Sequence, residues 1–277
     1  GDNFWESPWG EGRPGWHIEC SAICMKHLGE SFDLHSGGVD LVFPHHENEI
    51  AQVEAVTDKT FARHWFHIAH LMVEGQKMSK SLGNLHTVEE LAERGYKAQE
   101  VRYVLLSGSY RQPLNFTFDS MKASRKALSK LSDFATRFDF KPTGGSSLET
   151  EFGPFYPVQE ALLADLNTPE ALGRCFRLIR ELGEAFERGE FDGKEGALAE
   201  VRRGFQATCD AFGLVVEPKV ENTEEAPAEI QDLAQRRWEA KQGKDWALAD
   251  QLRDELLAKG WTVKDGKDGF DLAPVVS

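Results

Sequence analysis

Cysteine is scarce in this sequence, and long apolar runs are missing from it. Four cysteines occur in 277 residues, at positions 20, 24, 175 and 209. They are too few for a disulfide framework in a chain of this length, which indicates a reducing compartment, the cytoplasm. No stretch of 18 consecutive apolar residues is present, so we expect no membrane span and no membrane partner.

Basic residues are also fewer than acidic ones. Lys and Arg number 32 against 46 Asp and Glu, a net charge of -14, which argues against non-specific adhesion to nucleic acid. Residues 101–150 are the exception, with 8 basic and 4 acidic side chains. Four basic residues there lie near one face of a predicted helix: Lys122, Arg125, Lys126 and Lys130. Such a stripe is usually only solvated, and the alternative is a nucleic-acid contact.

Two breaks in composition divide the chain. Residues 141–154 are rich in Pro, Gly and Ser, and residues 216–229 are acidic and contain Pro. Before the first break, short apolar runs alternate with helical periods, which is typical of an α/β layer. The expected elements are a helix over 16–28, a strand over 32–35 entering a glycine turn at 37–38, a helix from Pro44 to about 56, a strand over 65–73, and a capping box at Thr87.

The remainder is mostly helical. Thr168 is the expected N-cap of a helix with Pro169 at its first position, followed by an apolar stripe that runs from Leu172 to Phe186 and predicts a helical bundle. After the second break, the pattern predicts two helices, over 229–241 and 245–258, the second with Asp245 as its N-cap, and then a hairpin. The tail is therefore expected to be a small mixed module.

Three residues have the donor types of a zinc site. Cys20, His45 and Glu49 offer a thiolate, an imidazole and a carboxylate, which a borderline-soft cation accepts together. His45 and Glu49 lie four positions apart and share one helical face, and Cys20 lies on the neighbouring predicted helix. The alternative is that Cys20 is a small buried apolar residue and that the other two form a solvated pair.

Two loops carry candidate nucleotide-binding residues. The segment KMSKS at 77–81 places Lys77 and Lys80 in a Ser/Gly-rich loop, where their ammonium groups can stabilise charge on phosphate oxygens. The segment Ser36–Asp40, which contains Gly37 and Gly38, is a weaker candidate because an ordinary tight turn has the same composition.

Four segments together resemble cysteinyl-tRNA synthetase, a class I aminoacyl-tRNA synthetase. They are WGEGRPGWHIEC at 9–20, DLHSGGVDLVFPHHENEIAQ at 33–52, KMSKSLGN at 77–84 and RRWEAKQGKDWALADQLRDEL at 236–256. The resemblance covers the C-terminal part of that family. The family's HIGH signature and its first zinc-binding cysteine are expected upstream of these residues, so the chain is expected to be a fragment that is inactive by itself.

The resemblance implies a role for each matching residue. Cys20, His45 and Glu49 would be three of four ligands of one Zn²⁺ ion that binds the substrate thiol. Trp16 would pack beside the amino acid. Gly37, Gly38 and Asp40 would lie near ATP, which enters with Mg²⁺. Lys77 and Lys80 would be catalytic groups that contact its phosphates. Ser36 stands where the family has a third glycine, and the tail segment DGKDGFDL departs from the family's usual ending.

The resemblance implies an α/β fold with three domains. These are the C-terminal half of a class I Rossmann-type catalytic domain at 1–115, a helical tRNA-binding bundle at 116–218, and a small mixed α/β anticodon-side domain at 219–277. The expected activity is ligation of L-cysteine to tRNA-Cys through a cysteinyl adenylate, by a cytoplasmic monomer. Two alternatives remain at this point: the cysteine ligase of mycothiol synthesis, and a non-catalytic tRNA-binding remnant.

Overall fold

A computed structural model describes most of the chain. The described residues are 3–79, 82–142, 151–219, 226–243, 245–266 and 269–274. They form two compact units, Gly1–Pro218 and Lys219–Ser277, each of which is described by itself. Within the described residues, each helix is too short or too polar to cross a bilayer.

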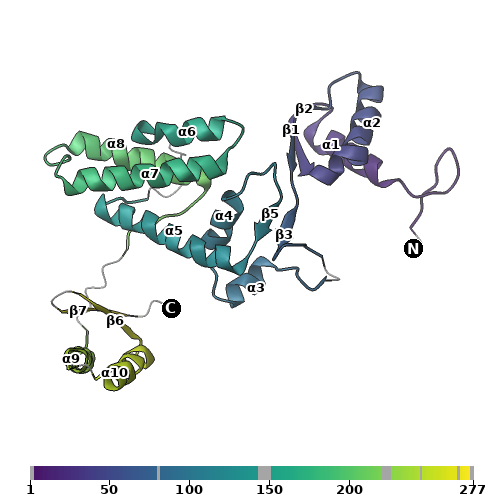
Figure 1. Cartoon of the computed structure of the whole chain (residues 1–277). Coiled ribbons are helices and arrows are strands. Elements are labelled where there is room, and N and C mark those ends of the chain that lie inside the picture. Colours follow the sequence, from purple (N-terminus) through teal and green to yellow (C-terminus); the bar gives the residue numbers. More distant parts are fainter. Residues whose placement is uncertain are drawn as a thin grey trace. The chain divides into compact units, whose positions relative to one another are not determined.

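The N-terminal part of the first unit is a parallel strand pair with two helices. Strands β1 (Phe32–Gly38) and β2 (Ala62–Ile68) pair in parallel. Helix α2 (Glu47–Thr57) lies on the connection between them, as a parallel pair requires, and packs against α1 (Trp16–Leu28) (Figure 1). The expected helix over 16–28 is confirmed.

Three expectations for this region are wrong in detail. The expected glycine turn belongs to β1, because Gly37 and Gly38 stay extended to pair with His67 and Ile68 of β2. The helix expected from Pro44 begins as a π-helical turn over Val42–His46, after a 3₁₀ turn over Val39–Leu41. The strand expected over 65–73 is two strands, because Ala69 donates its N–H to Tyr110 and the chain changes sheets there.

A second small sheet carries the lysine loop. Its central strand β3 (Leu71–Val73) pairs antiparallel with β4 (Gln76–Lys77) and parallel with β5 (Leu114–Phe116). Helices α3 (Val88–Glu93) and α4 (Ala98–Leu106) follow in the chain. The capping box at Thr87 is confirmed by reciprocal hydrogen bonds with Glu90. A small core lies among these elements and the helix that follows them: Val73, Leu91, Val104, Phe116 and Met121.

Four helices form the bundle: α5 (Phe118–Arg137), α6 (Tyr156–Leu163), α7 (Thr168–Glu187) and α8 (Glu195–Phe212). The expected stripe of α7 contributes to their large aromatic core. The N-cap of α7 is Asn167, whose side chain accepts from the backbone of Glu170. The expected cap, Thr168, is instead the first residue of the helix, and Pro169 is the second.

The second unit is the expected small mixed module. Helices α9 (Ala228–Gln242) and α10 (Trp246–Ala258) precede a hairpin of β6 (Trp261–Asp265) and β7 (Phe270–Pro274). Asp245 caps α10, as expected. The fold class expected from the sequence is therefore confirmed.

Candidate metal and nucleotide site

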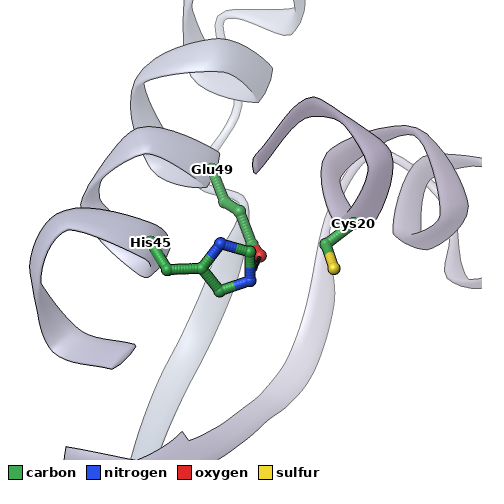
Figure 2. A group of neighbouring side chains, drawn as sticks. All are labelled: Cys20, His45 and Glu49. Carbon is green, nitrogen blue, oxygen red and sulfur yellow. Dashed lines mark ion pairs between the residues drawn. The ribbon is translucent and has the colours of Figure 1, made fainter. Parts of the chain in front are cut away.

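The three candidate metal ligands come together between two helices. Cys20 lies on α1, His45 lies in the π-helical turn that leads into α2, and Glu49 lies in the first turn of α2. Their donor atoms all lie within 4.8 Å of one another, and Figure 2 shows the thiol on one helix facing the imidazole and carboxylate on the other. Helix packing thus brings together residues that are 25 and 29 positions apart.

Glu49 is the centre of this cluster, and its carboxylate is fully buried. Its Oε2 lies 2.7 Å from His35 Nε2, within a hydrogen bond. Its Oε1 lies 2.7 Å from His45 Nε2, but this approach lacks hydrogen-bond geometry, and Oε1 accepts no hydrogen bond from a described residue. A buried carboxylate oxygen without a donor is costly unless a cation lies beside it. The arrangement therefore fits a cation held by Oε1 and Nε2.

His45 is oriented by two aromatic neighbours. Trp16 stacks on its ring with a centroid distance of 4.5 Å and an interplanar angle of 20°. Nδ1 of His45 lies 2.8 Å from Nδ1 of His17, so one of the two nitrogens donates to the other. When Nδ1 of His45 holds the proton, Nε2 presents its lone pair to the cluster. Trp16 itself is 60% exposed, which leaves its ring open to a ligand.

The environment of Cys20 disfavours the thiolate form of its side chain. Burial, and then the negative charge of Glu49, raises the pKa of this thiol. A divalent cation reverses that effect, because a coordinated thiol loses its proton. Cys24 lies one turn further along α1, and burial raises its pKa too. The donor set of Cys20, His45 and Glu49 is one that zinc accepts, with a position left for a further ligand.

Three more histidines surround the cluster, and none of them was predicted from the sequence as a site residue. His35 of β1 stacks on Trp65 of β2 at 4.8 Å. His46 Nδ1 lies 2.8 Å from Nε2 of His67, and burial lowers the pKa of His46 to about 4. A second set of donor atoms, on His35, His46 and Glu49, also lies within 4.8 Å. No spacing rule predicts this group, because it depends on the pairing of β1 with β2 and on the position of α2.

The glycines at the end of β1 make room for this histidine group. A Cβ atom at Gly37 would lie 2.8 Å from the His46 ring and 2.9 Å from Leu41, so a larger residue there would displace one of them. A side chain at Gly38 would meet the Asp40 carboxylate. Asp40 lies on the exposed side, with Oδ1 at 3.6 Å from His70 Nε2. The expected nucleotide residues thus lie beside the metal candidates, at the C-terminal end of a parallel strand.

The lysine loop is closed by an asparagine. Asn84 accepts from the backbone N–H of Ser79 at 2.8 Å and donates to the carbonyl of Lys77 at 3.1 Å. Lys77 is exposed at the end of β4. Lys80, the other expected catalytic lysine, lies outside the described residues. The role of Asn84 was not predicted, although the residue belongs to the KMSKSLGN segment.

Only some residues of the expected basic stripe on α5 are free of ion pairs with described residues. Arg125 makes two hydrogen bonds to the buried carboxylate of Glu100, at 2.7 and 3.2 Å, and a third to the carbonyl of Gly95. Lys122 pairs with Asp119 at the surface. Arg125 therefore ties α5 to α4, while Lys126 and Lys130 are exposed without an ion pair to any described residue.

The comparisons with known proteins first define a class. Residues 1–126 match the catalytic domain of tRNA synthetases class I (C). The fold is similar to that of a LeuRS from Agrobacterium radiobacter K84, solved in a ternary complex with tRNA, with a TM-score of 0.52 and 15% identity. That similarity covers 74% of this chain and 31% of the other. The chain thus contains part of a class I aminoacyl-tRNA synthetase.

The particular family follows from the tail and from sequence relatives. Residues 223–270 match the cysteinyl-tRNA ligase anticodon-binding domain. Over 99% of its length the chain is 48% identical to the cysteine–tRNA ligase of Opitutus terrae, and over 97% it is 46% identical to that of Solibacter usitatus. The chain belongs to the cysteinyl-tRNA synthetase family. It spans about half the length of these relatives, 55% and 58%.

Proposed function

We propose that this chain is part of a cysteine–tRNA ligase, which activates L-cysteine with ATP and transfers it to tRNA-Cys. The observation that carries the proposal is the convergence of Cys20, His45 and Glu49 on a buried carboxylate oxygen that lacks a donor. The match of the tail to an anticodon-binding domain supports tRNA as the acceptor rather than the amino sugar of mycothiol synthesis.

In this proposal Cys20, His45 and Glu49 hold one Zn²⁺ ion. Zinc is a Lewis acid that binds a thiolate much more strongly than a hydroxyl, so the site would select cysteine over serine. His35 fixes the Glu49 carboxylate through Oε2, and His17 and Trp16 fix the His45 ring. The exposed ring of Trp16 covers the position of the amino acid and limits the access of water.

The same proposal assigns the nucleotide side of the site. Gly37 and Gly38 let a ligand approach the end of β1 closely, and Asp40 is available to accept a hydrogen bond from it. Lys77 and Lys80 meet the phosphates of ATP, which enters with Mg²⁺. Because Asn84 joins both ends of the loop, it positions the lysines rather than touching ATP. We further propose a monomer that works in the cytoplasm.

Pyrophosphate exchange tests this function. A polypeptide that carries these residues at its natural length should exchange pyrophosphate into ATP with L-cysteine and at background with L-serine. Lys80→Ala should slow adenylate formation by about 100-fold or more and leave cysteine binding nearly unchanged, because the ammonium acts mainly in the transition state. Equal exchange with serine would contradict the role of the metal. Loss of cysteine binding in Lys80→Ala at an unchanged rate would contradict the role of that lysine.

A further inference from the structure

The turn that joins β3 to β4 lies just before the lysine loop and is anchored on the residues that lead into α5. The turn consists of Glu74 and Gly75. The backbone N–H of Glu74 donates to the carbonyl of Phe116 at 3.0 Å. The backbone N–H of Gly75 donates to Oδ1 of Asn115 at 2.8 Å. The Glu74 side chain adds a third bond, because its Oε1 accepts from the backbone N–H of Phe118 at 3.0 Å. All three bonds end at the junction of β5 and α5 (Figure 1).

Glu74 has a backbone conformation that its residue type disfavours. Its φ angle is 49°, in the left-handed region, and that of Gly75 is 76°. Two positive φ angles in a two-residue hairpin turn are typical of type I′, in which Asn, Asp and Gly are the favoured residues. A glutamate in this conformation costs energy that a glycine avoids and an asparagine reduces. The requirements of the turn therefore do not explain why a glutamate occupies this position.

The carboxylate of Glu74 explains it, because this group caps α5 from a distance in the sequence. Phe118 is the first residue of that helix, and its N–H is one of the groups that a helix leaves without an intrahelical partner. A negative charge at this end is also favoured by the helix dipole. Asparagine and aspartate are one carbon shorter than glutamate, so the residues that suit the turn place their oxygen farther from Phe118.

The other end of the lysine loop reaches the same residue. His86 lies two positions after Asn84, which closes the loop, and its ring packs edge-on against the ring of Phe118 with a centroid distance of 5.4 Å. Met78, inside the loop, and Phe118 both pack against the small core of this region. The first residue of α5 thus contacts the chain on both sides of the loop, through its backbone on one side and its ring on the other.

The position of Lys77 depends on this anchorage. Strand β4 has two residues, Gln76 and Lys77, and a strand pair of this length is not stable by itself. Lys77 lies three positions after Glu74, at the end of that short strand. A displacement of about 1 Å in a group that contacts the reacting atoms can slow a reaction by about 100-fold. A contact that fixes the turn can therefore act on the rate without touching ATP.

We propose that Glu74 is a positioning residue for the activation of cysteine: its carboxylate holds the turn on the N-terminus of α5 and so places Lys77 at the phosphates of ATP. The role in activation rests on the proposed function. The anchoring of the turn does not, and it can be measured without activity.

Two variants of Glu74 separate the reach of the side chain from the needs of the turn. Glu74→Gln keeps the length and the acceptor oxygen. Glu74→Asn suits the left-handed backbone better but is too short to reach Phe118. Glu93→Ala is the control, because Glu93 is an exposed residue of α3 that forms no hydrogen bond or ion pair with the described part of the chain. Glu74 is itself exposed, so we expect all three variants to fold.

Pyrophosphate exchange measures the rate, on a polypeptide that carries these residues at its natural length. Glu74→Asn should lower kcat by about 10- to 100-fold and leave the KM for cysteine unchanged, since the metal cluster that binds cysteine lies on other elements. Glu74→Gln should stay within about threefold of the parent, and Glu93→Ala should match it. If only the turn mattered, Glu74→Asn would be at least as active as Glu74→Gln.

Limited proteolysis measures the anchorage in the same polypeptides. The initial rate of tryptic cleavage after Lys77, followed by mass spectrometry, should rise several-fold in Glu74→Asn and remain near that of the parent in Glu74→Gln and Glu93→Ala. This readout requires no bound ATP and no activity.

The outcomes separate this inference from the proposed function. Equal kcat values and equal cleavage rates for Glu74→Asn and Glu74→Gln would overturn the role of Glu74. A raised KM for cysteine in Glu74→Asn would also overturn it, because the change would then not be confined to the lysine loop. A parent that exchanges no pyrophosphate would contradict the proposed function and the role of Glu74 in activation, whereas faster cleavage of Glu74→Asn would still support the anchoring of the turn.

Discussion

The metal region, residues 16–68, and the helical bundle, α5 to α8, differ in the kind of residue that they bury. Between residues 16 and 68, the buried apolar residues are Val53, Phe61 and Ala62, while four polar residues are equally buried: Ser21, His45, His46 and Glu49. The bundle instead has one large core with many aromatic contacts. The bundle is therefore stabilised mainly by packing, whereas the metal region depends on polar pairs and on what binds there.

The largest expected effect is in the bundle core. Phe205 is 1% exposed and packs against Phe134, Phe140 and Phe155. Phe205→Ala should lower the free energy of unfolding by about 3–5 kcal/mol, because it removes buried apolar surface and leaves a cavity. Leu163→Ala, at a 76% exposed position of α6, should change it by less than about 0.5 kcal/mol. Denaturation monitored by circular dichroism measures both, and similar losses would show that this core is not tightly packed.

The metal region should respond to zinc rather than to packing. His45→Ala should weaken zinc binding by more than about 100-fold, since even an outer partner of a ligand contributes 10- to 100-fold. His64→Ala is the control, because His64 is an exposed histidine of β2. Competition with a chelator gives both affinities, and equal affinities would place the metal elsewhere.

Thermal stability with and without zinc distinguishes the metal region from the bundle. Zinc should raise the melting temperature of the parent and of Phe205→Ala alike, because a ligand of the native state stabilises in proportion to its binding. His45→Ala should gain almost nothing from zinc. A zinc effect that disappears in Phe205→Ala would show that the regions are not independent.

A smaller effect is expected where α5 meets α4. Arg125→Gln removes the cation that donates two hydrogen bonds to the buried carboxylate of Glu100, and it should lower the free energy of unfolding by less than Phe205→Ala does. Lys126→Gln, the next position on α5, should be nearly neutral. Urea denaturation of the two variants compares them, and equal stability would contradict the structural role of Arg125.

The smallest expected effect is a pH dependence. Hydrogen bonds from Arg111, and then from Tyr110, lower the pKa of Asp165 to about 2. A lowered pKa in the folded state means that this stabilisation is complete above about pH 4 and is lost as the pH falls toward 2. Asp165→Asn should therefore flatten the fall in stability between pH 4 and 2. An unchanged acid profile would show that this surface pair contributes nothing measurable.

The sequence predicted the local features and missed the ones that depend on distant contacts. Helical spacing was enough to group His45 with Glu49, and capping rules were enough for Thr87 and Asp245. The positions of His35 and His67 follow from the pairing of two strands that are 30 residues apart, which no local pattern encodes. The partners of Arg125 could not be predicted for the same reason, since they depend on how α5 packs against α4.

In the function that we propose, Cys20, His45 and Glu49 hold a zinc ion that binds the thiol of cysteine. X-ray absorption at the zinc edge tests it directly on the zinc-loaded chain. We expect that L-cysteine adds one sulfur to the zinc coordination, that L-serine adds none, and that Cys20→Ser removes one sulfur from the ligand-free site. A sulfur count that is the same with and without L-cysteine, or that does not change in Cys20→Ser, would contradict it.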